Sequence, residues 1–314
     1  MSGRQVFFQE TWRESMKGFN FLPLVLILLL LIFLNFDLVV RQIIRRDTLI
    51  NSPVSALGST FYPSLSIASE PMLSAQSALI IDDSSKVILF SKNPTLRFST
   101  ASTAKIMTAL VALDFYKMDD VITVQSDNVM PFVMGFKIGE RLIFSDMLYS
   151  LLLPSANDAA VAIAQNYPGG ETAFVDKMNQ YAHNLHLVNT HFGDPAGLLD
   201  SQNYTNALDL AELASYALKN KQFAQVVSTK QKSFTDLDGE NFLIYSRNKL
   251  LGIDGIDGVK TGYTEEAGEV LVTSKLVNGH RIIIVVMGSD DRFADTLNLL
   301  HLIFGNITYL QNHL

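Results

Sequence analysis

The segments with β-strand character lie at the two ends of one long region, and this distribution restricts the fold more than any other feature. Short apolar runs at 78–82 and 86–90 are separated by a polar stretch of Asp and Ser, a pattern typical of a β-hairpin. Runs rich in Val and Ile return only late in the chain, at 258–262, 269–274 and 281–287. Strands from distant parts of the sequence must therefore share one sheet, which indicates an α/β (α+β) fold with one all-helical lobe.

Helical periodicity fills the region between these strands and returns after the last of them. Ser145 is expected to cap one of the helices, and Pro154 to stop it. A short additional strand is expected at 121–124. The expected helices span 102–115, 145–153, 159–167, 171–187, 205–218 and 292–304.

The stretch 21–34 is an uninterrupted apolar run, and with its flanks it reaches the length of about 20 residues that a bilayer crossing needs. A cleaved signal peptide is the alternative, but no small-residue cleavage site follows the run. We therefore expect a transmembrane anchor or uncleaved signal at 19–40, between a short tail (1–18) and a Ser/Pro-rich linker (41–74). Basic residues flank the run on both sides, so the charge pattern does not fix its direction across the bilayer.

Composition argues against several classes of function. The chain of 314 residues carries a net charge of −7 and has no basic stripe, which argues against nucleic acid as a partner. It contains no cysteine, so disulfides, thiolate metal sites and a cysteine nucleophile are excluded. A metal site built from His183, His186, His191 and Asp194 is a weak alternative, because only the first two share a helix face.

Ser102 and Lys105 are the first candidates for nucleophilic chemistry. Ser102 lies at or near the expected start of an apolar helix, and Lys105 follows one turn later on the same face. A hydroxyl beside an amine that burial keeps neutral can act as a nucleophile with its base. The alternative is that Ser102 is only an N-cap, since the same four-residue pattern also occurs at 246–249 without a helical continuation.

The sequence Lys260-Thr261-Gly262 stands before a strong pair of β segments. A free strand edge can bind a peptide as an added strand, and the glycine leaves that edge unobstructed. Lys260 and the Thr261 hydroxyl could then bind the terminal carboxylate of the peptide. The alternative is a turn with a solvated lysine.

Ser155 and Asn157 form a Ser-x-Asn pattern in a tight connection between two buried helices, which would hold both side chains rigidly. The pattern also occurs at 126–128 and 201–203. The first of these copies ends a short strand in a polar stretch, so its context is weaker.

Taken together, Ser-x-x-Lys, Ser-x-Asn and Lys-Thr-Gly in this order resemble the signature of the serine penicillin-recognising enzymes. The longer segments 99–108, 151–160 and 257–268 are similar to the motifs of the low-molecular-mass D-alanyl-D-alanine carboxypeptidases, and 189–198 resembles a loop of that family. The resemblance favours Ser155 over the other Ser-x-Asn copies. It implies a β-lactamase/transpeptidase-like fold with an antiparallel sheet flanked by helices. The catalytic domain would span 75–314, without the C-terminal β-domain that is frequent in the family.

The resemblance also implies acyl transfer that needs no metal or cofactor. Ser102 would attack the carbonyl between two terminal D-alanines while Lys105 accepts its proton, and Ser155 would relay a proton to the leaving group. Asn157 would position the substrate amide and Lys105. Backbone N–H groups of Ser102 and Tyr263 would stabilise the oxyanion.

Carboxylate binding is implied for the third motif and for two arginines. Lys260 and Thr261 would hold the terminal carboxylate of the substrate beside Gly262. Arg247 and Arg292 match arginines that lie near that carboxylate in the family, although a surface arginine is the usual default.

The implied partners are a peptidoglycan stem peptide ending in D-Ala-D-Ala, β-lactam antibiotics, and the lipid bilayer through 19–40. The expected location is the cell membrane, with a single pass and the catalytic domain on the extracytoplasmic side. The alternatives are a D,D-endopeptidase, a β-lactamase, or a catalytically silent peptidoglycan-binding or penicillin-sensing protein. A class A β-lactamase needs a glutamate for deacylation, and Glu171 is better interpreted as a helix start. His186 departs from the family pattern, because a glycine is common at its position.

Overall fold

A computed structural model describes residues 61–66, 69–126 and 132–311. The tail and the anchor expected at 1–18 and 19–40 lie outside these residues. Within the described stretches, none of the helices is both long enough and apolar enough to cross a membrane.

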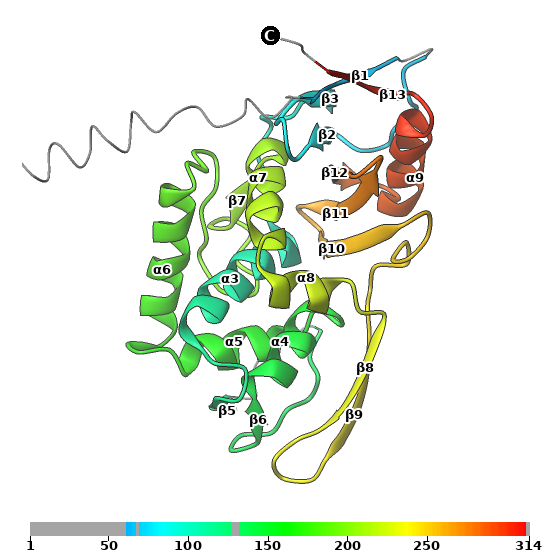
Figure 1. The fold of residues 1–314 in the computed structure, drawn as a ribbon. Helices are drawn as coiled ribbons and strands as arrows, with labels where there is room; N and C mark the ends of the chain where they lie inside the picture. The colour runs from blue at the N-terminus through cyan, green and yellow to red at the C-terminus, as the bar shows by residue number, and fades with distance from the viewer. Residues whose placement is uncertain (1–60, 67–68, 127–131, 312–314) are drawn as a thin grey trace, which may run out of the picture. The chain divides into compact units, whose positions relative to one another are not determined.

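The central sheet has five antiparallel strands in the order β10-β11-β12-β2-β3 (Figure 1). β12 from the late part of the chain pairs with β2 from the early part, and Ile284 lies opposite Ile80. The sheet therefore joins distant parts of the sequence, as the distribution of β segments predicts. The strands are β2 (Ser77–Asp82), β3 (Ile88–Lys92), β10 (Ile256–Thr264), β11 (Gly268–Val277) and β12 (His280–Ser289).

Both faces of this sheet are covered, which explains why its central strands are nearly continuous runs of Val and Ile. Ile283 and Val285 of β12 belong to the large core that includes α7 (Ala207–Leu218). Ile282 and Ile284 face the other way and belong to the core that includes α9 (Arg292–Ile303). Successive strand residues point to opposite faces, so a strand buried on both sides needs apolar residues throughout.

The middle of the chain forms a lobe of helices packed around α3, whose residues 105–112 are all buried. The lobe is not all-helical, and that part of the prediction is wrong. It carries the pair β5 (Val121–Thr123) and β6 (Arg141–Ile143), and the ribbon β8 (Gln231–Thr235) and β9 (Asn241–Tyr245) follows it. The helices are α3 (Lys105–Phe115), α4 (Phe144–Leu152), α5 (Asn157–Gln165), α6 (Gly170–Asn184) and the unpredicted α8 (Lys221–Val227).

Part of the segment predicted as a linker is ordered structure instead. β1 (Phe61–Leu65) pairs antiparallel with β13 (Ile307–Gln311), so the two ends of the described chain form a separate ribbon. Ser74, at the end of the predicted linker, donates its hydroxyl hydrogen to the Asp295 carboxylate of α9 at 2.7 Å. The described part of 41–74 therefore belongs to the folded unit.

Two predicted helix ends also differ from the structure. The N-cap of α4 is Ile143 and it makes no side-chain cap bond, so the assignment of Ser145 as the cap is wrong. α6 ends at Asn184 instead of 187. His186 then takes a left-handed backbone conformation with φ +58°, which suits the glycine common at this position in the family. Glu171 lies in the first turn of α6, as predicted.

Candidate active site

Ser102 and Lys105 lie at the junction of a short 3₁₀ helix, η1 (Ala101–Ala104), and α3. Ser102 is in the second position of η1 and is half-buried, and Lys105 begins α3. The N-cap of η1 is Thr100 and makes no side-chain cap bond, so the N-cap interpretation of Ser102 is wrong. The Lys105 amine lies 2.9 Å from the Ser102 hydroxyl oxygen, which suits a nucleophile and its base.

The Lys105 amine is completely buried and touches three oxygen atoms. Besides Ser102, it lies 2.6 Å from Asn157 Oδ1 and 2.8 Å from the backbone carbonyl of Ala196. A neutral amine has two N–H groups and one lone pair, and both of these other oxygens can only accept hydrogen bonds. They therefore take both N–H groups, which leaves the lone pair for the Ser102 hydroxyl.

The surroundings of Lys105 favour that neutral form. Burial lowers its pKa to about 7, the negative charges of Asp194 and Asp158 raise it, and the positive charge of Arg247 lowers it. Near neutral pH a large share of the Lys105 amines can therefore accept a proton.

Ser155 faces a second buried lysine. It is 3% exposed and has φ +67° in the connection between α4 and α5. The Lys260 amine donates to the Ser155 hydroxyl at 2.7 Å and to the Thr261 carbonyl at 2.9 Å. The pKa of Lys260 lies well below its ordinary range because of burial, and then because of the nearby positive charges of Lys105 and the two arginines. The two buried amines therefore disfavour each other's charge.

The other copies of the short motifs lie elsewhere. Ser126 binds the side chain of Gln165 at the end of α5, at the opposite end from Asn157. Asn203 donates its side-chain amide to the Asp194 carboxylate at 2.6 Å. Lys249 of the second Ser-x-x-Lys pattern lies over the ring of Phe293. The structure thus brings together the residues that the three-motif resemblance selects.

Gly262 allows η1 to pack closely against β10. A Cβ atom at this position would lie 3.2 Å from the Ala101 Cβ and 3.4 Å from the Ser102 backbone nitrogen. Among the described residues β10 pairs only with β11, so its other edge faces the site. The Tyr263 side chain is half exposed, and the role of its N–H in an oxyanion hole stays a prediction.

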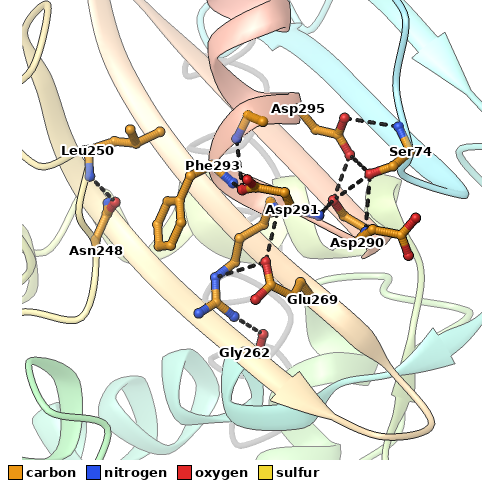
Figure 2. Close-up of polar contacts among 12 residues, drawn as sticks. Ser74, Asn248, Leu250, Gly262, Glu269, Asp290, Asp291, Phe293 and Asp295 are labelled. Carbon is orange, nitrogen blue, oxygen red and sulfur yellow. Dashed lines mark hydrogen bonds and ion pairs between the residues drawn. The ribbon is translucent and has the colours of Figure 1, made fainter.

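The two arginines differ in their environments. Arg292 donates to the Gly262 carbonyl at 2.7 Å, and its backbone N–H donates to Glu269 at 2.9 Å (Figure 2). Burial lowers its pKa, and it supports β10 from α9. Arg247 is exposed, and its guanidinium lies 4.4 Å from the ring centroid of Phe132.

Two groups at the site were not predicted from the sequence. The Ala196 carbonyl is a backbone atom, and the only signal for it was the similarity of 189–198 to a family loop. Phe132 stacks on Arg247, and its carbonyl accepts from the Asn157 N–H at 2.8 Å. Nothing in the local sequence marks Phe132, which is one exposed apolar residue among several.

The histidines considered for a metal site lie on the surface at the end of α6 and in the following loop. Asp194 binds backbone N–H groups instead of joining them. Over the described part of the chain, no group of three or more His, Asp or Glu side chains is arranged to hold a metal ion.

Comparison with known proteins gives a family and several relatives. A family model described as D-alanyl-D-alanine carboxypeptidase matches residues 65–291. The carboxypeptidase DacF of Bacillus subtilis is 35% identical over 53% of this chain and 44% of its own length, and the D-alanyl-D-alanine endopeptidase of Pseudomonas aeruginosa is 33% identical over 62% and 65%. A D-alanyl-D-alanine carboxypeptidase of Streptomyces sp. strain K15 is 35% identical over 58% of this chain and 70% of its own length.

Comparison with solved structures agrees with this result. The crystal structure of the Streptomyces K15 DD-transpeptidase matches with a TM-score of 0.72 and 32% identity, covering 76% of this chain and 100% of that chain. The chain spans about half the length of the first curated relatives it matches.

Proposed function

Because the chain belongs to the D-alanyl-D-alanine carboxypeptidase family, we propose that it is a serine peptidase that removes the terminal D-alanine from peptidoglycan pentapeptide stems. The observation that carries this proposal is the geometry of the Lys105 amine. The amine lies within hydrogen-bond distance of Ser102, Asn157 and Ala196 oxygens, and in its neutral form the last two take both N–H groups, which leaves the lone pair for the Ser102 hydroxyl.

The acylation step follows from this geometry. The Ser102 oxygen attacks the carbonyl carbon between the two D-alanines, and the hydroxyl proton passes to Lys105. The C–N bond then breaks, and the leaving amine takes the Ser155 hydroxyl proton, which the protonated Lys260 amine in contact with that hydroxyl replaces. In the second half of the reaction water attacks the ester carbonyl and its proton passes through Ser155 back to Lys260. Lys105 returns its proton to the Ser102 oxygen as that oxygen leaves, which restores the starting state.

Recognition of the substrate is assigned to the edge of β10 and the groups around it. The peptide would lie along that edge, with its terminal carboxylate near Lys260 and Thr261. Arg247 is exposed and can turn toward an anion, whereas Arg292 is occupied with the Gly262 carbonyl. We therefore assign the direct carboxylate contact to Arg247 and a supporting role to Arg292.

The test combines two measurements on the same protein. The purified chain should release D-alanine from a pentapeptide, and a fluorescent penicillin should form a stable adduct that peptide mass analysis locates at Ser102. Ser102→Ala should abolish both activities. Ser246→Ala is the matched control from the second Ser-x-x-Lys pattern, and it should keep both. An adduct at another residue would refute the assignment.

The substrate panel also decides between related activities. One relative is named a D-alanyl-D-alanine endopeptidase, so a cross-linked peptide belongs in the panel beside the pentapeptide. Faster cleavage of the cross-linked peptide would favour the endopeptidase. Rapid turnover of penicillin in place of a lasting adduct would favour a β-lactamase, and an adduct without peptide cleavage would favour a penicillin-sensing protein.

The membrane location belongs to the same proposal. The apolar run at 21–34 supports a single-pass anchor over 19–40. The side follows from the proposed substrate, because an enzyme acting on peptidoglycan needs its catalytic domain on the extracytoplasmic side. Intact-mass analysis of protein extracted from membranes checks the anchor, because a mature chain that starts after residue 40 would contradict it. Protease added to intact cells from which any outer barrier has been removed should digest the catalytic domain.

A further inference from the structure

The carboxylate of Asp194 lies at the centre of the loop that follows α6, and its side chain is almost completely buried. It binds four successive backbone N–H groups and one side-chain amide, all at 2.6–2.9 Å. The donors are Ala196 and Gly197 to Oδ1, and Leu198, Leu199 and the Asn203 amide to Oδ2. This number of bonds to one carboxylate fixes the conformation of the loop.

The same loop is packed tightly against the elements that carry the nucleophile and its base. The Thr108 hydroxyl of α3 donates to the Pro195 carbonyl. Gly197 has φ +79°, and a Cβ atom there would lie 1.9 Å from the Ala101 carbonyl oxygen of η1. Between these two contacts the Ala196 carbonyl meets the Lys105 amine at 2.8 Å.

On the basis of the function proposed above, we propose that Asp194 is a positioning residue for Lys105. By binding the loop N–H groups it fixes the Ala196 carbonyl, and with it the direction of the Lys105 lone pair toward Ser102. Its negative charge also acts on the amine.

The charged groups that act on Lys105 come from several of the elements around it. Asp158 on α5 and Asp194 favour the protonated amine, and Arg247 disfavours it. The positive charge of Lys105 lowers the pKa of Lys260 on β10. By the same repulsion a charged Lys260 disfavours the protonated form of Lys105, as Arg247 does. Glu171 of α6 faces Asp194 and has a pKa raised by burial and by that neighbour. Replacing Asp194 by a neutral residue therefore removes a charge that raises the pKa of Lys105.

Asp194→Asn is the variant that tests the proposal. The readout is the second-order rate of acylation by a fluorescent penicillin, measured from pH 5 to pH 9. We expect a lower plateau rate, which is the acylation rate at high pH where the amine is neutral. We also expect a lower midpoint of the acid-side fall: the pH at which the rate is half of its plateau should lie about one unit below that of the wild-type chain. A lower midpoint is expected because the protonated amine loses a favourable partner.

Asp209→Asn is the matched control. Asp209 is also a buried carboxylate of this region, and it accepts from the Asn189 N–H and the Thr190 hydroxyl. It is not among the charges that act on Lys105. Its replacement should lower thermal stability and leave the midpoint of the pH profile in place.

A folded Asp194→Asn variant with the wild-type midpoint would overturn the proposal. If that variant does not fold, Asp194→Glu keeps the charge and displaces the carboxylate by one methylene. It should keep the wild-type midpoint and lose at least about tenfold in plateau rate, since small misplacements of a catalytic group are costly. An unchanged plateau rate would then overturn the proposal. A failure of the proposed function can be told apart from a failure of the Asp194 proposal, because the wild-type chain itself would then neither bind penicillin nor release D-alanine.

Discussion

Acylation of Ser102 is expected to fall steeply below pH 7, and the size of the effect follows from the buried amine of Lys105. Only the neutral amine can accept the hydroxyl proton, and burial lowers its pKa from the ordinary value of 10.5 to about 7. At pH 7 about half of the molecules then carry the neutral amine, whereas about 3 in 10,000 would do so at the ordinary pKa. The environment thus supplies roughly a thousandfold more base at neutral pH.

The same numbers predict the whole acid side of the profile. The acylation rate should drop about 50-fold between pH 7 and pH 5, and it should rise only about twofold between pH 7 and pH 9. The assay is the rate of fluorescent penicillin labelling in quenched samples, normalised to active protein. Lys105→Arg is the control, because a guanidinium at this position stays protonated and should abolish labelling.

Two results would refute this reasoning. A rate that is flat from pH 5 to pH 8 would mean that Lys105 is not the base. A rate that keeps rising up to pH 10 would mean that the amine keeps an ordinary pKa in spite of its burial.

Three further outcomes are expected. Arg247→Gln should move the midpoint of the acid-side fall to higher pH, because the guanidinium disfavours the protonated lysine; in the same labelling assay, a shift to lower pH would contradict this sign. Gly197→Ala should abolish labelling and lower the melting temperature in a thermal scan, because its methyl group would collide with the Ala101 carbonyl; wild-type values would show that the loop can move aside. Tyr309→Phe should lower the free energy of unfolding by about 1 kcal/mol in urea, because the hydroxyl donates to the buried Asp82 carboxylate at 3.0 Å; an unchanged midpoint would mean that this bond adds nothing.

The sheet could be predicted from the sequence because its central strands are buried on both faces. In the sequence such strands are nearly continuous runs of Val and Ile, and the run at 281–287 is the clearest of them. The ribbon of β8 and β9 escaped prediction for the opposite reason. Phe234 is the only large apolar residue in β8, and alternate residues of the strand are exposed, so the periodic signal is weak. β1 and β13 are also short, and within the part of the chain that the structure describes they pair only with each other.

Helix starts were less predictable than helix cores because tertiary packing overrides local capping. Phe144 is completely buried and begins α4, so the helix starts one residue before the Ser145 that the capping rule selects. At the nucleophile the short helix η1 places the hydroxyl of Ser102 toward Lys105 instead of toward the helix N–H groups. Local sequence cannot distinguish these outcomes, because both depend on contacts with residues far along the chain.

The site itself could be predicted as a set of side chains but not as a network. The three motifs identify Ser102, Lys105, Ser155 and Lys260, and the structure brings these residues together. The Ala196 carbonyl has no signal beyond the similarity of 189–198 to a family loop, because every residue has a carbonyl and only the fold decides which one meets the amine.

The repulsion between the two buried lysines decides which of them carries a proton in the proposed reaction. Lys105 and Lys260 disfavour each other's positive charge, so the site resists carrying both charges at once. A substrate that ends in a carboxylate brings a negative charge to Lys260, which favours its protonated form. The Lys260 charge in turn disfavours protonation of Lys105, which keeps that amine available as the base. The terminal carboxylate would thus help to divide the roles between the two lysines, in addition to fixing the position of the peptide.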